Sequence, residues 1–76
     1  MNITLPKWGM TMQEAVITEW LVAVGDTVTE GQPLVHVESD KVDAEVEAPG
    51  SGTISEITVL NGQTAEVGAL LGRIDP

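Results

Sequence analysis

Two lysines, Lys7 and Lys41, are the residues through which this chain could carry covalent chemistry. A lysine that acts as a Schiff-base nucleophile needs a depressed pKa, which burial or a neighbouring cation provides. Near Lys41 the sequence instead places Glu38, Asp40 and Asp43, and opposite charges favour the protonated ammonium. We therefore expect Lys41 to be a poor nucleophile, but a suitable acceptor for a group that a separate enzyme activates and attaches.

The sequence around each lysine also allows a plain structural interpretation. Lys41 stands in E-S-D-K-V-D between two strand-like runs, and Ser39 and Asp40 are typical turn residues. Judged by spacing alone, Lys41 is a solvated turn lysine that balances its acidic neighbours. Lys7 lies in a segment without a strand pattern, Pro6 to Ala15, and is expected to be an ordinary surface lysine.

Metal chemistry has little support in the sequence. His36 lies within an apolar run, and without cysteine or a second histidine it is expected to be structural rather than a ligand. The acidic residues near Lys41 lack the D-x-[DN]-x-[DN]-G pattern of a calcium loop. Strand alternation predicts instead that Asp43, Glu45 and Glu47 line a solvated face, and no metal site is predicted.

The composition limits the classes of function. The chain has 76 residues, which is enough for one domain (residues 1–76). So short a chain has few residues with which to enclose an enzyme pocket, and this favours a binding or carrier role. Twelve acidic against three basic side chains give a net charge of −9, so nucleic-acid and membrane-surface roles are not expected and partners with basic patches are favoured. No apolar run approaches a membrane span and no secretory signal opens the chain. We expect a soluble, cytoplasmic domain.

Strands must position these residues, because β-branched side chains dominate the sequence. Ten valines, five isoleucines and eight threonines favour strands, and no segment shows a sustained helical stripe. The clearest strand is Val42 to Ala48, where apolar and acidic residues alternate with a period of two. Rougher runs, separated by Gly, Pro and Asn turn residues, cover residues 2–5, 16–22, 34–38, 53–60 and 70–74. The sequence predicts an all-β fold.

An internal repeat predicts how the strands are arranged. Residues 17–38 match residues 54–75, and Gly25 and Gly62, like Leu34 and Leu71, are 37 positions apart. Two repeats are too few for a solenoid. They suit a flattened barrel or sandwich of two quasi-twofold-related halves, in which each half covers the apolar face of the other.

The repeat also predicts where Lys41 lies relative to the chain ends. After Glu38 the chain continues through Lys41 into the next strand, whereas after the equivalent residue, Asp75, the chain ends. We therefore expect the Lys41 turn and the two termini at opposite ends of the molecule. A group attached to Lys41 would then point away from anything joined to the termini.

Three motifs resemble the lipoyl domains of 2-oxoacid dehydrogenase acyltransferase components. They are P-K-W-G-M-T-M-Q-E-A, V-G-D-T-V-T-E-G-Q-P-L-V-H-V-E-S-D-K-V and E-A-P-G-S-G, which together cover nearly the entire chain. The resemblance implies the biotinyl/lipoyl-domain fold, with eight strands in two four-stranded sheets. It also implies that lipoate is attached through an amide to Lys41, flanked by Asp40 and Val42.

The resemblance assigns roles to further residues. Glu38, Gly25 and Gly52 match positions associated with recognition by lipoate-attaching enzymes. The apolar residues Trp8, Met10 and Met12 match a loop that helps the partner dehydrogenase to recognise the domain, although as apolar loop residues they could instead plug one end of the barrel. One departure is Ala15, where many members of the family have glycine.

The family implies a carrier that is a substrate of enzymes and not a catalyst. A thiamine-diphosphate dehydrogenase component acylates the lipoyl group reductively, an acyltransferase catalytic domain passes the acyl group to coenzyme A, and dihydrolipoamide dehydrogenase reoxidises the lipoyl group. Two alternatives are a biotin carrier domain of a carboxylase and an unmodified interaction domain. Biotin carriers read Met-Lys-Met where this chain has Asp40-Lys41-Val42, which favours lipoate.

Overall fold

The computed structural model describes residues 1–7, 12–40 and 43–76, and these ranges form eight strands and no helix. No helix in the described ranges is therefore long and apolar enough to cross a membrane. In chain order the strands are β1 (Asn2–Thr4), β2 (Glu14–Trp20), β3 (Thr27–Val28), β4 (Pro33–Glu38), β5 (Asp43–Glu47), β6 (Gly52–Ile57), β7 (Thr64–Glu66) and β8 (Leu70–Asp75).

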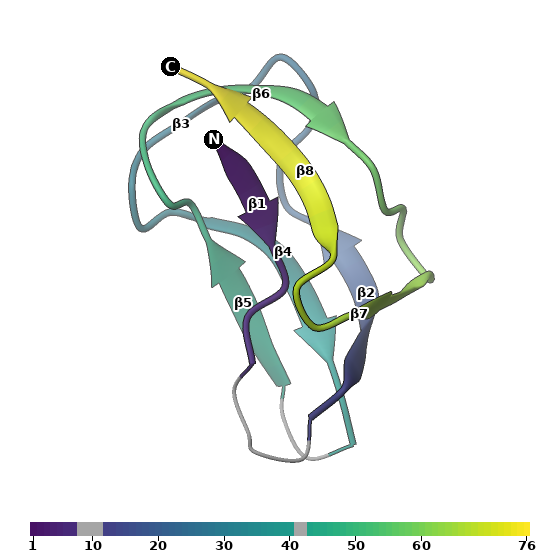
Figure 1. Ribbon diagram of the computed structural model, residues 1–76. Coiled ribbons are helices and arrows are strands. Elements are labelled where there is room, and N and C mark those ends of the chain that lie inside the picture. Colours follow the sequence, from purple (N-terminus) through teal and green to yellow (C-terminus); the bar gives the residue numbers. More distant parts are fainter. Residues whose placement is uncertain (8–11, 41–42) are drawn as a thin grey trace.

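The strands form two antiparallel sheets of four, in the orders β1-β8-β6-β3 and β5-β4-β2-β7 (Figure 1). Strands at the same position in the two sheets are four strands apart in the chain, as β1 and β5 or β8 and β4 are. The molecule measures 33 × 21 × 16 Å, so it is flattened. The predicted all-β barrel or sandwich of two quasi-twofold-related sheets is confirmed.

The backbone repeats the same turn in both halves. Gly25 and Gly62 have φ angles of +97° and +87°, in the left-handed region that glycine adopts without a Cβ clash. The Gly25 amide donates to the Ile54 carbonyl at 2.8 Å, and the Gly62 amide donates to the Ile17 carbonyl at 2.6 Å. Each half thus bonds its turn to a strand of the other half, which ties the two sheets together.

The core between the sheets is aliphatic. Among the described residues every buried side chain is apolar, and no buried side-chain nitrogen or oxygen lacks a partner. Each half contributes equivalent residues, including Ile17 and Ile54, Leu34 and Leu71, and Val37 and Ile74, all at most 1 % exposed. Because these side chains alternate with exposed ones along their strands, a slip of one residue would turn them to solvent, and this fixes the register.

The strand limits differ from the sequence prediction at two places. Strand β2 begins at Glu14 inside the segment predicted to lack strand structure, since Glu14 pairs with Glu66 and Ala15 with Ala65. The short strands β3 and β7 were not among the predicted runs. In both cases the strand is defined by a partner distant in the sequence, and local alternation carries no information about that partner.

The two chain ends lie together, far from one end of the β4–β5 hairpin. The Met1 ammonium donates to the Ile74 carbonyl at 2.6 Å, so the N-terminus lies beside the last strand. Figure 1 shows both termini at the top, whereas β4 ends and β5 begins near the bottom. The described parts of this hairpin therefore agree with the predicted polarity of the domain, while Lys41 itself lies outside the described residues.

Candidate functional site

The candidate site is the end of the β4–β5 hairpin that flanks Lys41. The pairing runs from Pro33 opposite Glu47 to Glu38 opposite Asp43, so four residues, 39–42, connect the strands. Lys41 and Val42 lie outside the described residues. The hairpin strands on either side are described and determine where this connection starts and ends.

Buried residues hold this hairpin in register. Leu34, Val35 and Val37 of β4 and Val46 of β5 are at most 5 % exposed. Burying an aliphatic side chain of this size contributes about 1.5–3 kcal/mol, so the register is held by several such contributions. The strand ends on either side of Lys41 are consequently fixed by packing that lies well inside the domain.

The end of the hairpin is acidic. Glu38, Asp40 and Asp43 are all exposed, and Glu38 lies directly opposite Asp43. Solvated carboxylates therefore lie on both sides of residues 41–42 along the chain. Lys41 itself lies outside the described residues, so its expected lack of intrinsic nucleophilicity stays a prediction.

His36 lies on the outer face of the same hairpin and links three strands. The Thr18 hydroxyl of β2 lies 2.5 Å from His36 Nδ1 and 2.8 Å from the His36 carbonyl oxygen. On the other side, His36 Nε2 contacts Asp43 Oδ1 of β5. The predicted structural role of His36 fits these contacts, but sequence reasoning missed both partners, because cross-strand neighbours are set by the register of β4 with β2 and β5.

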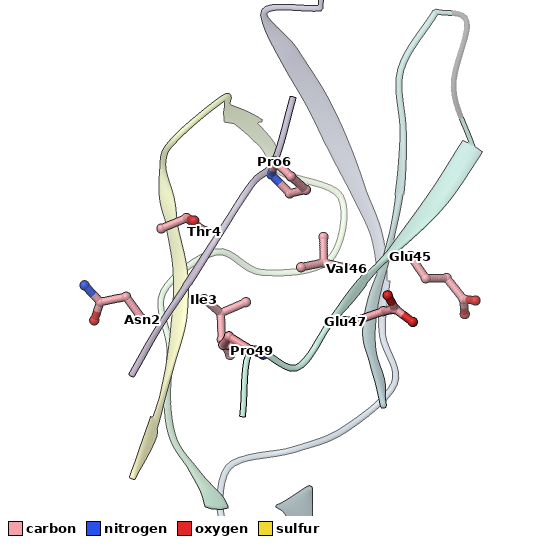
Figure 2. Close-up of a pocket in the computed structure, with 8 residues that line it drawn as sticks. All are labelled: Asn2, Ile3, Thr4, Pro6, Glu45, Val46, Glu47 and Pro49. Atoms are coloured by element: carbon pink, nitrogen blue, oxygen red, sulfur yellow. The ribbon is translucent and has the colours of Figure 1, made fainter. Parts of the chain in front are cut away.

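An open groove of about 280 Å³ separates the edge strands β1 and β5. It is lined by Asn2, Ile3, Thr4, Pro6, Glu45, Val46, Glu47 and Pro49. Figure 2 shows Ile3 and Val46 facing the space between the two strands, while the carboxylates of Glu45 and Glu47 extend away from β1. The groove therefore presents backbone and aliphatic surface, and its charged groups point to solvent beside it.

Comparison with known proteins identifies the family. The family model described as Biotin-requiring enzyme (Biotin_lipoyl) matches residues 1–74. The solution structure of the lipoyl domain of the 2-oxoglutarate dehydrogenase complex from Azotobacter vinelandii superposes with a TM-score of 0.80 at 30 % identity, covering 100 % of this chain and 96 % of that one. The chain is a lipoyl domain of the Biotin_lipoyl family.

The sequence relatives of this lipoyl domain are acyltransferase components. It is 45 % identical over 73 residues to the dihydrolipoyllysine-residue acetyltransferase component of the pyruvate dehydrogenase complex of Corynebacterium glutamicum. It is 42 % identical to the corresponding component of the acetoin cleaving system of Cupriavidus necator, and 41 % to the lipoamide acyltransferase component of the branched-chain alpha-keto acid dehydrogenase complex of Bacillus subtilis. The alignments cover 96–97 % of this chain but only 11–20 % of these relatives.

The family determines the cofactor class. Lipoyl domains of acyltransferase components carry lipoate attached covalently to a lysine. This lipoyl domain has two lysines. Lys7 is exposed just after β1, as predicted for a surface lysine, and Lys41 belongs to the connection between β4 and β5.

The two glycines expected to take part in enzyme recognition have backbone roles at the other end of the lipoyl domain. A Cβ on Gly52 would lie 2.2 Å from the Asp75 carbonyl oxygen, so only glycine fits against β8 there. Gly25 has a positive φ and bonds to Ile54 beside it. Both positions lie near the C-terminal end of β8, away from the acidic end of the hairpin (Figure 1).

The expected partner loop is described at its margins only. Trp8 and Met10 lie outside the described residues. Met12 is half-buried and packs against the core. Met12 therefore has the packing role that was the alternative to partner recognition, and the role of Trp8 and Met10 stays a prediction.

Proposed function

We propose that Lys41 carries the lipoyl group of this domain and that the domain shuttles acyl groups and reducing equivalents between active sites of a 2-oxoacid or acetoin dehydrogenase complex. The observation that carries this proposal is the hairpin register. Pairing ends at Glu38 and Asp43, so the described residues that flank Lys41 in the sequence lie at the end of the molecule opposite the termini. A domain tethered through its termini would then direct this end of the hairpin outward.

The proposed cycle needs four partners. A lipoate-attaching enzyme forms the amide on Lys41, and Asp40, Val42 and Glu38 are the neighbours through which it would recognise the site. A thiamine-diphosphate dehydrogenase component then acylates one sulfur while the lipoyl disulfide is reduced. An acyltransferase catalytic domain passes the acyl group to coenzyme A, and dihydrolipoamide dehydrogenase reoxidises the dithiol. The relatives span pyruvate, acetoin and branched-chain systems at similar identity, so the proposal extends to this class and not to one substrate.

Tethering explains what the domain contributes physically. A carrier linked to its partners visits each active site at an effective concentration that can reach the millimolar range. The net charge of −9 would steer it toward basic rims on those partners, an effect that salt screens. Acylation by the dehydrogenase component at limiting carrier concentration should therefore slow as ionic strength rises.

Intact-mass measurement after incubation with a lipoate-attaching enzyme tests the attachment site. The unchanged chain and the Lys7→Arg variant should each gain the mass of one lipoyl group, and Lys41→Arg should gain none. Arginine keeps the charge, so a loss in Lys41→Arg reflects the missing acceptor and not a change in surface charge. Lipoate on Lys7, a gain of biotin, or no gain in the unchanged chain would each contradict the proposal.

A second measurement separates exposure from position. The double variant Asp40→Lys with Lys41→Asp keeps the composition and net charge but moves the amine by one residue. Strand register determines where a side chain at each position points, so attachment to the shifted lysine should fall sharply. Efficient attachment at residue 40 would show that exposure alone is sufficient.

The proposed partner loop has its own test. If Trp8 contacts the dehydrogenase component, Trp8→Ala should slow reductive acylation more than it lowers the melting temperature. If Trp8 belongs to the core, the substitution should cost about 3–5 kcal/mol, a large share of the stability of so small a domain. Melting and acylation measured on the same variant distinguish these roles, with Met12→Ala as the comparison for a residue that packs against the core.

A further inference from the structure

Three potential metal ligands meet on the outer face of the β4–β5 hairpin. One donor atom each from His36, Glu38 and Asp43 lies within 4.8 Å of the other two. His36 and Glu38 are two residues apart on β4 and so share a face, and Asp43 lies opposite Glu38 on β5. In the sequence these residues gave no metal signal, because the third ligand comes from the neighbouring strand.

Thr18 holds the histidine in the orientation that a ligand needs. Its hydroxyl has one proton, which it donates to the His36 carbonyl oxygen at 2.8 Å. The 2.5 Å contact with Nδ1 then leaves the ring to donate its Nδ1 proton to the hydroxyl oxygen. Metal-binding histidines are commonly oriented in this way, with one ring nitrogen donating to an oxygen and the other free to coordinate.

The remaining ring nitrogen faces negative charge. Nε2 is the ring atom that hydrogen-bonds the Asp43 carboxylate, and the Glu38 carboxylate is close by. A metal ion would replace the proton of this hydrogen bond and pair with both carboxylates at once. Like charges directly opposite on paired strands, as in Glu38 and Asp43, are unfavourable. A bound cation would offset this repulsion.

We infer that His36, Glu38 and Asp43 form a binding site for a divalent cation of the zinc class. An imidazole ligand favours zinc, nickel or copper, whereas calcium and magnesium prefer oxygen ligands alone. Ligands around zinc lie about 2.0–2.2 Å from the ion, and the exposed carboxylates can rotate to reach it. Water would complete the coordination. The ion links β4 to β5 next to the connection that contains Lys41.

The other half of the domain provides an internal control. Arg73 occupies the position 37 residues after His36, and the Ser55 hydroxyl donates to its carbonyl at 3.3 Å, as Thr18 does for His36. Arginine has no lone pair to give a metal. The equivalent of Glu38 is Asp75, which is exposed and has no histidine beside it. The proposed site is therefore confined to one half.

Calorimetric titration of the 76-residue chain with zinc chloride tests the inference. We expect one ion per chain, and at least about tenfold weaker binding after His36→Gln, Glu38→Gln or Asp43→Asn. The control variants Glu45→Gln and Asp75→Asn remove the same charge elsewhere and should bind zinc as the unchanged chain does. Magnesium chloride should give no comparable binding. Glu38 and Asp43 are exposed, so these two amide variants keep the test valid if His36→Gln folds poorly.

A second readout identifies the ligand directly. The chain contains one histidine, so its ring signals in NMR spectra belong to His36 without ambiguity. Zinc should shift these signals, and Thr18→Val should weaken zinc binding by about tenfold or more by releasing the ring. The inference fails if the unchanged chain binds no zinc below about 1 mM, the weak end of specific binding. It also fails if the control variants weaken binding as much as the ligand variants, which would indicate diffuse attraction to an acidic surface.

Discussion

The two halves of this lipoyl domain have the same backbone fold but different surface side chains. Thr18 and Ser55 occupy equivalent positions on β2 and β6, and each donates its hydroxyl to the carbonyl of the equivalent residue on the adjacent strand, His36 or Arg73. Beyond that shared bond the halves diverge. His36 contacts Asp43 across the hairpin, whereas the Arg73 guanidinium approaches Glu56 at 4.0 Å.

This difference shows which positions the fold constrains. Inward-facing positions must be aliphatic in both halves, because each half covers the core of the other. Outward-facing positions have no such requirement. One half therefore has an acidic hairpin end next to Lys41 in the sequence, while the equivalent place in the other half carries the chain ends. The predictions below compare equivalent residues in the two halves, beginning with the largest expected effect.

Truncation of equivalent core residues should have the largest effect. Ile17 and Ile54 are 0 % and 1 % exposed, and replacing either by alanine should cost about 2–5 kcal/mol through lost burial and the cavity left behind. Denaturant unfolding of both variants measures the two costs. Costs that agree within about 1 kcal/mol would support equal roles for the halves, and a large difference would show that one half dominates the core.

Substitutions at Gly52 and Ala15 should have the next-largest effect on stability, and the two effects should differ. Gly52 and Ala15 are equivalent positions, but a Cβ on Gly52 would lie 2.2 Å from the Asp75 carbonyl oxygen, whereas Ala15 is accommodated at 2 % exposure. Gly52→Ala should therefore cost about 1–3 kcal/mol or more by forcing the backbone apart. Ala15→Gly should cost at most about 1 kcal/mol through backbone entropy. Thermal melting of the two variants compares them, and equal losses would contradict the close contact.

Removing the hydroxyl of Thr18 or of Ser55 should have a smaller effect on stability. Thr18→Ala removes the partner of both the His36 carbonyl and Nδ1, whereas Ser55→Ala removes one longer hydrogen bond. A typical hydrogen bond contributes about 0.5–1.5 kcal/mol, so Thr18→Ala should cost more than Ser55→Ala. Unfolding measurements on the two variants decide this. A larger cost for Ser55→Ala would mean that the Thr18 contacts contribute little.

The exposed pair of Arg73 and Glu56 should have the smallest effect. Their side chains are 57 % and 51 % exposed, and exposed ion pairs contribute about 0–1 kcal/mol. Arg73→Gln should therefore change stability by less than about 1 kcal/mol, and added salt should reduce even this difference. A melting curve at low and at high salt provides the measurement. A larger loss would point to an additional contact made by the arginine stem.

Sequence patterns alone determined much of this lipoyl domain. Alternation in Val42 to Ala48 predicted the strand observed as β5 (Asp43–Glu47). The repeat of Gly25 and Gly62 predicted two similar halves. Both patterns reflect which face of a strand is buried and where the backbone must turn. The motif around Lys41 identified the family. Each of these features can be read from the order of residues in the chain, without knowing which strands pair.

Tertiary structure alone decided which distant residues meet. The start of β2 at Glu14 and the existence of β3 and β7 depend on pairing with strands far away in the chain. The contact of Gly52 with Asp75, and the cluster of His36, Thr18 and Asp43, likewise follow from strand register and from the packing of one half on the other. Exposed side chains are free of the alternation that the core imposes, so no periodic pattern in the sequence marks such encounters.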